Sequence, residues 1–256
     1  MSFFDEIHLG SALIVGAGQG IGLGFVQRLL LEPKILRVYA TYHQKEHATS
    51  LISLAQLHPN QLICFYMDVT DEAQIEKCAK KISQYTKELH LVINCVGVLH
   101  DTQLKPEKSL RQAKQENLLK YFQINSITSI LLAKHFLPLF IHQDSSIFAC
   151  ISAKIGSIGD NKLGGWYGYR ASKAALNMFI RTIAIEYRRK SPKTIVVSLH
   201  PGTTNTQLSL PFQKNVLPGK LFSVEFTVTQ LINVIAHLKD VDSGCFFSWD
   251  GSRLPW

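Results

Sequence analysis

The chain has 256 residues and a formal net charge of +8, with 46% hydrophobic and 18% charged residues. These proportions are typical of an ordinary soluble globule, and the length suits one large domain with a substantial core. No apolar stretch is long enough to span a bilayer, and the segment MSFFDEIHLG lacks the basic start of a secretory signal. The five cysteines are scattered without a Cys-x-x-Cys pair, which favours reduced thiols and a cytoplasmic protein.

The positive charge does not by itself indicate nucleic-acid binding. Its densest cluster, YRRKSPK at 187–193, falls where a helix is expected to end. Basic side chains there complement the negative end of the helix dipole, so a solvated helix end explains the cluster. A general positive field would also favour a cofactor that carries several phosphates.

Short apolar runs rich in β-branched residues alternate along the chain with longer segments of helical spacing, such as 71–85. This alternation predicts a parallel sheet with helices on both faces, which is a doubly wound (Rossmann) α/β fold in a single domain over 1–256. Seven strands are expected, at 11–15, 36–42, 61–67, 89–95, 145–151, 194–199 and 244–248.

The first expected strand runs into the stretch VGAGQGIG, which spaces Gly16, Gly20 and Gly22 over the start of a helix. Glycines allow a tight turn and a close approach of the backbone to a pyrophosphate. The helix that follows directs its free N–H groups and positive dipole end at the anion. The sequence therefore predicts a dinucleotide site at the first strand-to-helix turn.

The end of the second expected strand bears on the choice of dinucleotide. An acid there would bind the ribose hydroxyls of NAD and repel a 2′-phosphate, but no acid lies between Val38 and Lys45. His43 and Lys45 could meet the phosphate, which favours NADP over NAD, although they could also merely start a solvated helix. His43 and His47 have the spacing of two helical metal ligands, but no third ligand is nearby, so no metal site is predicted.

The stretch GGWYGYRASKAALNM at 164–178 contains two tyrosines and one lysine. Tyr169 and Lys173 are four residues apart and share a helix face, whereas the residue four after Tyr167 is Ala171. An ammonium one turn away favours the phenolate and lowers the pKa of the phenol. Tyr169 is therefore predicted to be a general acid/base, and Tyr167 to be a packing or pocket residue.

Five motifs together resemble those of the short-chain dehydrogenase/reductase family, and the resemblance covers essentially the whole chain. They are GAGQGIG at 16–22, DVT at 68–70, NCVG at 94–97, YRASK at 169–173 and PGTTNT at 201–206. Within the family, the chain is most similar to the C-factor-like, carbonyl-reductase-like group. The stretches that match this group are 98–108, 156–178 and the ending WDGSRLPW.

The resemblance implies a role for each matching residue. Tyr169 would protonate a carbonyl oxygen, Lys173 would lower the pKa of Tyr169 and bind the nicotinamide ribose, and Asn125 would hold a water for proton relay. Asn94, Asp68 and Thr206 could instead serve only to cap local turns. The cofactor-binding residues expected in all are Gly16, Gly20, Ile21, Gly22, His43, Asp68, Val69, Asn94, Gly97, Tyr169, Lys173, Pro201, Gly202 and Thr206.

The chain departs from the family pattern most clearly at the catalytic serine. The family places this serine three residues before a glycine, and the residue three before Gly156 is Ala153. Ser152 and Ser157 are the neighbouring hydroxyls, and Ser152 is favoured because it lies at the carboxyl end of an expected parallel strand. Smaller departures are Val15 for threonine in the glycine loop, Cys95 and Val96 in the N-N-A-G turn, and no arginine for the 2′-phosphate.

These features predict an NADP-dependent oxidoreductase that transfers a hydride between nicotinamide and a small carbonyl or alcohol substrate. The alternatives are a dinucleotide-binding signalling protein of the C-factor type with little turnover, and an NAD-binding scaffold. The segment 203–225 is expected to cover the substrate with apolar side chains. As in the resembled family, the helices around 117–140 and after Tyr169 would form a homodimer or homotetramer interface, with no nucleic-acid or membrane partner.

Overall fold

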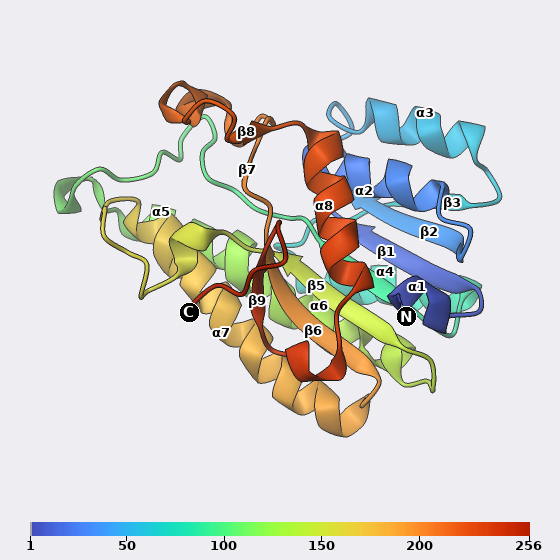
Figure 1. Cartoon of the computed structure of the whole chain (residues 1–256). Coiled ribbons are helices and arrows are strands. Elements are labelled where there is room, and N and C mark those ends of the chain that lie inside the picture. The colour runs from blue at the N-terminus through green and yellow to red at the C-terminus, as the bar shows by residue number, and fades with distance from the viewer. Residues whose placement is uncertain (1) are drawn as a thin grey trace.

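The computed structural model describes residues 2–256. A seven-stranded parallel sheet runs through the molecule in the order β3-β2-β1-β4-β5-β6-β9 (Figure 1). All seven expected strands are present, so the predicted doubly wound α/β fold is confirmed. The strands are β1 (Gly10–Val15), β2 (Ile35–Tyr42), β3 (Leu62–Tyr66), β4 (Leu91–Asn94), β5 (Ser146–Ile151), β6 (Thr194–His200) and β9 (Phe246–Ser248).

Helices cover both faces of this sheet (Figure 1). They are α1 (Phe3–Glu6), α2 (Gly20–Leu30), α3 (Thr49–Leu57), α4 (Glu72–Tyr85), α5 (Gln115–Phe122), α6 (Thr128–Phe136), α7 (Tyr167–Lys190) and α8 (Val224–Ala236). Short helical turns are η1 (Leu110–Gln112), η2 (Gln123–Ile127), η3 (Leu137–Phe140), η4 (Lys154–Gly156), η5 (Leu210–Asn215) and η6 (Asp240–Asp242). Within residues 2–256, no helix combines the length and the apolar character that a membrane crossing requires.

The buried apolar side chains form one large cluster on each face of the sheet. Neighbouring strand residues face opposite ways, so Leu13 joins the cluster beneath α4, α6 and α7, and Ile14 joins the cluster beneath α2 and α8. This two-sided burial explains why the strands read as nearly continuous apolar runs.

The carboxyl ends of the strands meet at one edge of the sheet, and the loops that leave this edge carry the predicted site residues. Chain order reverses between β1 and β4, which are neighbours in the sheet. Ligands of open α/β sheets bind in the crevice at such a reversal. The fold therefore brings the ends of β1, β4, β5 and β6 together around one candidate site.

The segment expected to cover the substrate is more ordered than a loop. It contains β7 (Thr203–Thr204) and β8 (Leu221–Phe222), which pair in parallel, with η5 between them. Gly202 precedes this ribbon with φ of +71°, and a Cβ there would lie 2.6 Å from the ring of Phe222. Only glycine fits this turn without displacement, and the ribbon leads on to α8 (Figure 1).

Candidate active site

The glycine loop after β1 forms a cradle that side chains would fill. A Cβ at Gly22 would lie 2.2 Å from the carbonyl oxygen of Gly16, and Gly16 itself has φ of +78°. The next helix, α2, begins at Gly20, and no side chain caps its N-terminus. Its first N–H groups therefore suit an anionic ligand, as a dinucleotide pyrophosphate requires.

Residues from two other strand ends lie against this cradle. A Cβ at Gly20 would lie 3.3 Å from Cγ2 of Thr206, so the segment after Pro201 and Gly202 reaches the glycine loop. On the other side, the Asn94 side-chain oxygen accepts a hydrogen bond from the Val96 N–H at 3.1 Å. Asn94 thus shapes the turn at the end of β4, and the structure brings these predicted cofactor residues together.

His43, at the end of β2, pairs with Asp68, which the sequence does not indicate. His43 Nε2 lies 3.3 Å from Asp68 Oδ2, and the other carboxylate oxygen accepts hydrogen bonds from the backbone and hydroxyl of Thr70. Burial raises the pKa of Asp68, but the Thr70 hydrogen bonds and the His43 charge outweigh it and leave that pKa below its ordinary value. Lys45 is exposed and forms no ion pair with any residue in 2–256.

Tyr169 and Lys173 lie in the first two turns of α7, and both side chains are buried, with exposed fractions of 7% and 3%. The Lys173 ammonium donates a hydrogen bond to the Ile151 carbonyl at 3.0 Å, at the end of β5. It lies 5.9 Å from the centroid of the Tyr169 ring. A Cβ at Gly97 would lie 3.5 Å from the same ammonium, so the turn after β4 borders it as well.

The protonation of this pair differs from the expectation drawn from spacing alone. Burial raises the pKa of Tyr169 above its ordinary value, whereas a lysine one turn away predicts a lower pKa. The same burial lowers the pKa of Lys173 to about 8. Burial is the cause of both shifts, and the Lys173 ammonium hydrogen-bonds a backbone carbonyl rather than the phenol. The phenol therefore stays protonated at neutral pH.

Asn125 lies in a π-helical turn, η2, between α5 and α6. Its side-chain oxygen accepts a hydrogen bond from the Val98 N–H at 2.7 Å, and its amide donates to the Val98 carbonyl and to Ser172 Oγ, both at 3.0 Å. Ser172 in turn donates to the Tyr169 carbonyl at 2.9 Å. Asn125 thus ties the loop after β4 to the helix that carries Tyr169, and π-turns are frequent at functional sites.

The three candidate positions for the serine face different surroundings. Ser152 Oγ donates to the side-chain oxygen of buried Asn177 at 2.7 Å. Ser157 Oγ donates to the Trp256 carbonyl at 3.3 Å. Ala153, by contrast, packs against the apolar cluster that contains Tyr169. Of these three positions, the one that packs against the cluster around Tyr169 therefore carries a methyl group, and the catalytic role of Ser152 remains a prediction.

Three residues that the sequence analysis did not select surround Tyr169. The rings of Tyr121 and Trp166 each pack edge-on against it, with centroids 6.2 Å away. The buried Glu107 side chain accepts a hydrogen bond from the Gly168 N–H at 3.1 Å, at the start of α7. The helical period of 115–122 could have indicated Tyr121, but Glu107 lies some sixty residues from the helix that it caps and gives no local signal.

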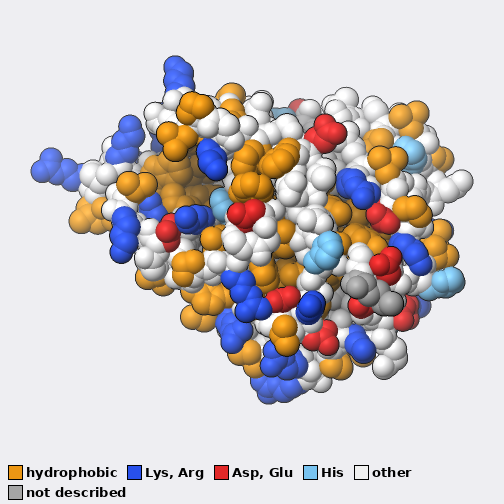
Figure 2. Space-filling model, in the orientation of Figure 1, with side chains coloured by type: hydrophobic (Ala, Val, Ile, Leu, Met, Phe, Trp, Pro, Cys, Tyr) orange, Lys and Arg blue, Asp and Glu red, His pale blue; other side chains and the backbone are white. Residues whose placement is uncertain are grey.

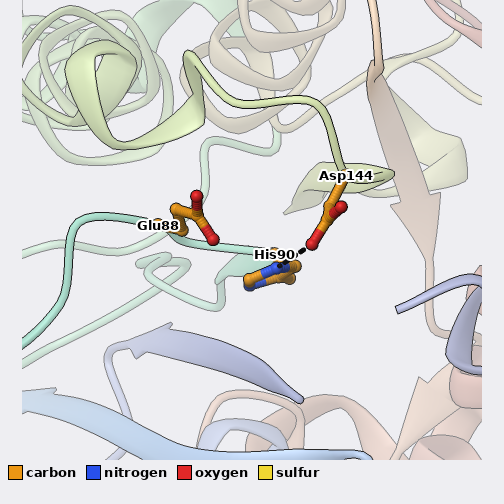
Figure 3. Close-up of side chains that lie close together, drawn as sticks. All are labelled: Glu88, His90 and Asp144. Atoms are coloured by element: carbon orange, nitrogen blue, oxygen red, sulfur yellow. Dashed lines mark hydrogen bonds and ion pairs between the residues drawn. The ribbon is translucent and has the colours of Figure 1, made fainter. Parts of the chain in front are cut away.

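One group of potential metal ligands lies at the opposite edge of the sheet (Figure 3). Oxygens of Glu88 and Asp144 and a nitrogen of His90 lie within 4.8 Å of one another. The His90 Nδ1 accepts a hydrogen bond from the Ser11 N–H at 3.2 Å, so its proton resides on Nε2, which faces Asp144. A protonated Nε2 has no lone pair for a cation, and the group therefore works as a hydrogen-bond arrangement.

Both the sequence and the fold are similar to those of known proteins. The family model described as "short chain dehydrogenase" matches residues 11–216. The NADPH-bound carbonyl reductase from chicken fatty liver is 30% identical, with a TM-score of 0.86 over 98% of this chain and 96% of its own.

Two curated relatives are also similar. The benzil reductase ((S)-benzoin forming) of Saccharomyces cerevisiae is 29% identical over 211 residues, which cover 80% of this chain and 76% of its own. The C-signal protein of Myxococcus xanthus is 30% identical over 140 residues, which cover 55% of this chain and 79% of its own. The first of these relatives is named as an enzyme, and the second is named for signalling.

Proposed function

Because the chain belongs to the short-chain dehydrogenase family and is an NAD(P)-dependent oxidoreductase of that family, we propose that it reduces carbonyl compounds with NADPH. The observation that carries the proposal is the buried pair Tyr169 and Lys173, beside a glycine cradle and at the carboxyl edge of the sheet. Tyr169 is the proton donor in this proposal, and the substrate is a small molecule.

The residues at the cradle fit a dinucleotide. Gly16, Gly20 and Gly22 would hold its pyrophosphate, and Asn94, Gly97 and Thr206 would line its nicotinamide half. Three observations favour NADPH over NADH. Lys45 is exposed, no acid lies at the end of β2, and the similar chicken carbonyl reductase has NADPH bound. When bound, the nicotinamide supplies the hydride.

The protein supplies the proton and the charge. A phenol whose pKa is raised stays protonated, so Tyr169 can donate a hydrogen bond to a carbonyl oxygen and then transfer its proton. Lys173, with a pKa of about 8, carries a positive charge at neutral pH and stabilises the phenolate that remains. These protonation states suit reduction better than oxidation, which would need a phenolate at the start.

Apolar side chains enclose the phenol. Leu99, Leu104 and Tyr121 pack with Tyr169, and Trp166 and Phe212 lie against the same cluster. Such walls exclude water and strengthen the electrostatic effect of Lys173. Asn125 fixes the position of Tyr169 through Ser172, and the water-holding role that the family resemblance implies for Asn125 is part of the proposal.

A second function, a dinucleotide-binding signalling protein with little turnover, has one specific observation in its favour. Ala153 supplies no hydroxyl toward Tyr169, and Ser152 donates to Asn177 instead. A pure binder, however, has no need to bury a lysine beside a phenol, because burial disfavours the charged form. The enzyme therefore remains the better proposal.

The same proposal includes a homo-oligomer and a cytoplasmic location. Apolar side chains are exposed on α5, η2 and α7. Their exposed fractions are 62% for Leu119, 41% for Ile127, 64% for Met178 and 50% for Ile185. Exposed apolar side chains on the two predicted interface helices support a homodimer or homotetramer. Light scattering of the purified chain would measure the mass, and a monomer would contradict this part.

NADPH consumption with a panel of ketones, aldehydes and 1,2-diketones tests the proposed function. The wild type and Tyr167→Phe should both turn over at least one of these compounds. Tyr169→Phe should bind NADPH but lose measurable turnover, because only the proton donor is removed. Full activity of Tyr169→Phe would overturn the mechanism, and a wild type without turnover on any carbonyl would favour the signalling function.

A further inference from the structure

The mouth of the site is formed by three segments that are far apart in the sequence: 98–114, 153–166 and 203–222. The ring of Phe212 lies 4.8 Å from that of Trp166 and 5.8 Å from that of His100, measured between centroids. His100 Nε2 also lies 3.2 Å from the Gln207 carbonyl. The three segments therefore close around the apolar cluster that contains Tyr169.

Figure 2 shows a hollow at this place, in the left half of the face drawn. Hydrophobic side chains line it, and Lys and Arg side chains stand around its rim. The segments 98–114, 153–166 and 203–222 carry eight Lys and Arg and three Asp and Glu, against nineteen and sixteen in the rest of the chain. Most of the net positive charge of the protein thus lies on less than a fifth of its residues.

Apart from Lys154, the bases on this rim form no ion pair with the acids near them in residues 2–256. Asp101 pairs with Lys120, Asp160 pairs with Lys154, and Glu107 is buried at the start of α7. The exposed bases of the first segment form no ion pair with any residue in 2–256. They are Lys105, Lys108, Arg111 and Lys114.

Neither a helix end nor the cofactor accounts for this charge. The basic cluster at 187–193 complements the carboxyl end of α7, but the segment 98–114 contains only the three-residue turn η1. The positions proposed for the 2′-phosphate, His43 and Lys45, follow β2, whereas the rim segments follow β4, β5 and β6. The rim field therefore acts on what enters the hollow beside Tyr169.

We propose that the substrate is an amphipathic anion, whose apolar body carries the carbonyl into the hollow while a carboxylate or phosphate group stays at the basic rim. The inference rests on the proposed function, because the hollow is the substrate site only if Tyr169 is the proton donor. It narrows the substrate class from any carbonyl compound to carbonyl compounds with a negative charge a short chain away.

Binding of three matched probes to the NADP⁺-saturated protein tests the inference. The probes are 5-oxo-5-phenylpentanoate, its methyl ester and 4-oxo-4-phenylbutyl phosphate, and the tryptophan fluorescence of the protein, to which Trp166 at the mouth contributes, reports their binding. At low salt at least one anion should bind ~10-fold more tightly than the ester, and added salt should remove the advantage. A preference for the carboxylate or for the phosphate identifies which anion the rim favours.

A triple variant and a matched control test whether the bases of the rim cause the preference for anionic probes. Lys105→Gln, Lys108→Gln and Arg111→Gln together should bring the affinities for acid and ester close to each other. Arg188→Gln, Arg189→Gln and Lys193→Gln remove the same charge at the far end of α7 and should leave the ratio unchanged.

Three outcomes would overturn the inference: an ester that binds as tightly as both anions, equal effects of the two triple variants, or no binding of any probe. NADPH-dependent reduction of the ester without an anion preference would overturn this inference and leave the proposed function intact. The reverse result, an anion preference without any reduction, would leave the rim site standing and overturn the proposed function.

Discussion

The two ends of helix α7 each carry a lysine on a long, regular helix, but in opposite surroundings. Lys173, near the start, is 3% exposed and has no carboxylate partner within residues 2–256, only the Ile151 carbonyl at 3.0 Å. Lys190, at the end, is exposed and pairs with Glu186 at 2.6 Å, one turn earlier. Lys190 lies where its charge complements the helix dipole, whereas Lys173 lies in the first half of the helix.

Folding stability alone explains the presence of Lys190 but not that of Lys173. Exposed pairs such as Glu186 and Lys190 contribute a few tenths of a kcal/mol and need no function. Burial of Lys173 lowers its pKa to about 8, so the folded state disfavours the charge at neutral pH at a cost of about 3 kcal/mol. A residue that destabilises the fold where it lies is best explained by chemistry.

The sharpest test of the comparison replaces each lysine by methionine. Lys173→Met should lower kcat/KM by about 10²-fold or more and weaken NADPH binding, because the phenolate and the ribose both lose a cation. The same change should raise the free energy of unfolding at pH 7 by about 1–3 kcal/mol, because a buried charge is removed. Steady-state kinetics and urea unfolding measure the two effects.

Lys190→Met is the matched control at the other end of α7. It should leave activity unchanged and alter the free energy of unfolding by less than about 0.5 kcal/mol. If the two variants lost activity equally, or if Lys173→Met unfolded the protein, the contrast between the two helix ends would be wrong.

The pH dependence of the rate follows from the lowered pKa of Lys173. Its ammonium is present below about pH 8 and is lost above it, while the raised pKa keeps Tyr169 protonated throughout. The rate of carbonyl reduction should therefore be level up to about pH 8 and fall about tenfold per pH unit above it. The free energy of unfolding should instead rise with pH between the folded pKa of Lys173, about 8, and its unfolded value of 10.5. In this range the unfolded chain still binds the proton that the folded chain has lost. A rate that climbs above pH 8 would exclude this assignment.

Substitutions at Ala153 and Ser152 test which hydroxyl acts on the substrate beside Tyr169. Ala153→Ser adds a hydroxyl on the side of Tyr169 and should raise kcat by about tenfold, which is below the usual effect of an optimised donor. Ser152→Ala removes the hydroxyl that is predicted to be catalytic and should lower kcat by about 10²-fold. A change in kcat of less than about threefold, with about 1–2 kcal/mol of stability lost, would instead show that this hydroxyl serves only to bind Asn177.

The cap on α7 gives the smallest expected effect. Glu107→Gln keeps an acceptor for the Gly168 N–H but removes a negative charge from the helix N-terminus, and should lower the free energy of unfolding by about 1 kcal/mol. Glu116→Gln, on the exposed start of α5, is a control that should change stability by half as much or less. Thermal unfolding of both variants measures the difference, and a more stable Glu107→Gln protein would contradict the cap.

The fold could be predicted almost completely from the sequence, because it depends on local regularities. Apolar runs rich in β-branched residues, which alternate with segments of helical spacing, predicted all seven strands of the sheet, and the glycine spacing predicted the glycine cradle at the first turn. The four-residue spacing of Tyr169 and Lys173 placed both at the start of one helix. Each of these signals lies within a few residues of the structure that it predicts.

The details of the site could not be predicted because they depend on contacts between distant segments. The direction of the Ser152 hydroxyl depends on Asn177, and the pairing of His43 depends on Asp68 from the next strand. The π-turn at Asn125 is fixed by the backbone of Val98. The raised pKa of Tyr169 reflects its burial, which its spacing from a lysine does not reveal.

Deuteride transfer tests the central claim most directly. The protein would be supplied with NADPH deuterated at C4 and with benzil, a 1,2-diketone, and the product would be analysed by mass spectrometry and NMR. The account predicts deuterium on the carbinol carbon of one product enantiomer with the wild type, and none with Tyr169→Phe at equal NADPH occupancy. Tight NADPH binding by the wild type without deuterium transfer to this or any other carbonyl would contradict the account and identify a dinucleotide-binding protein instead of a reductase.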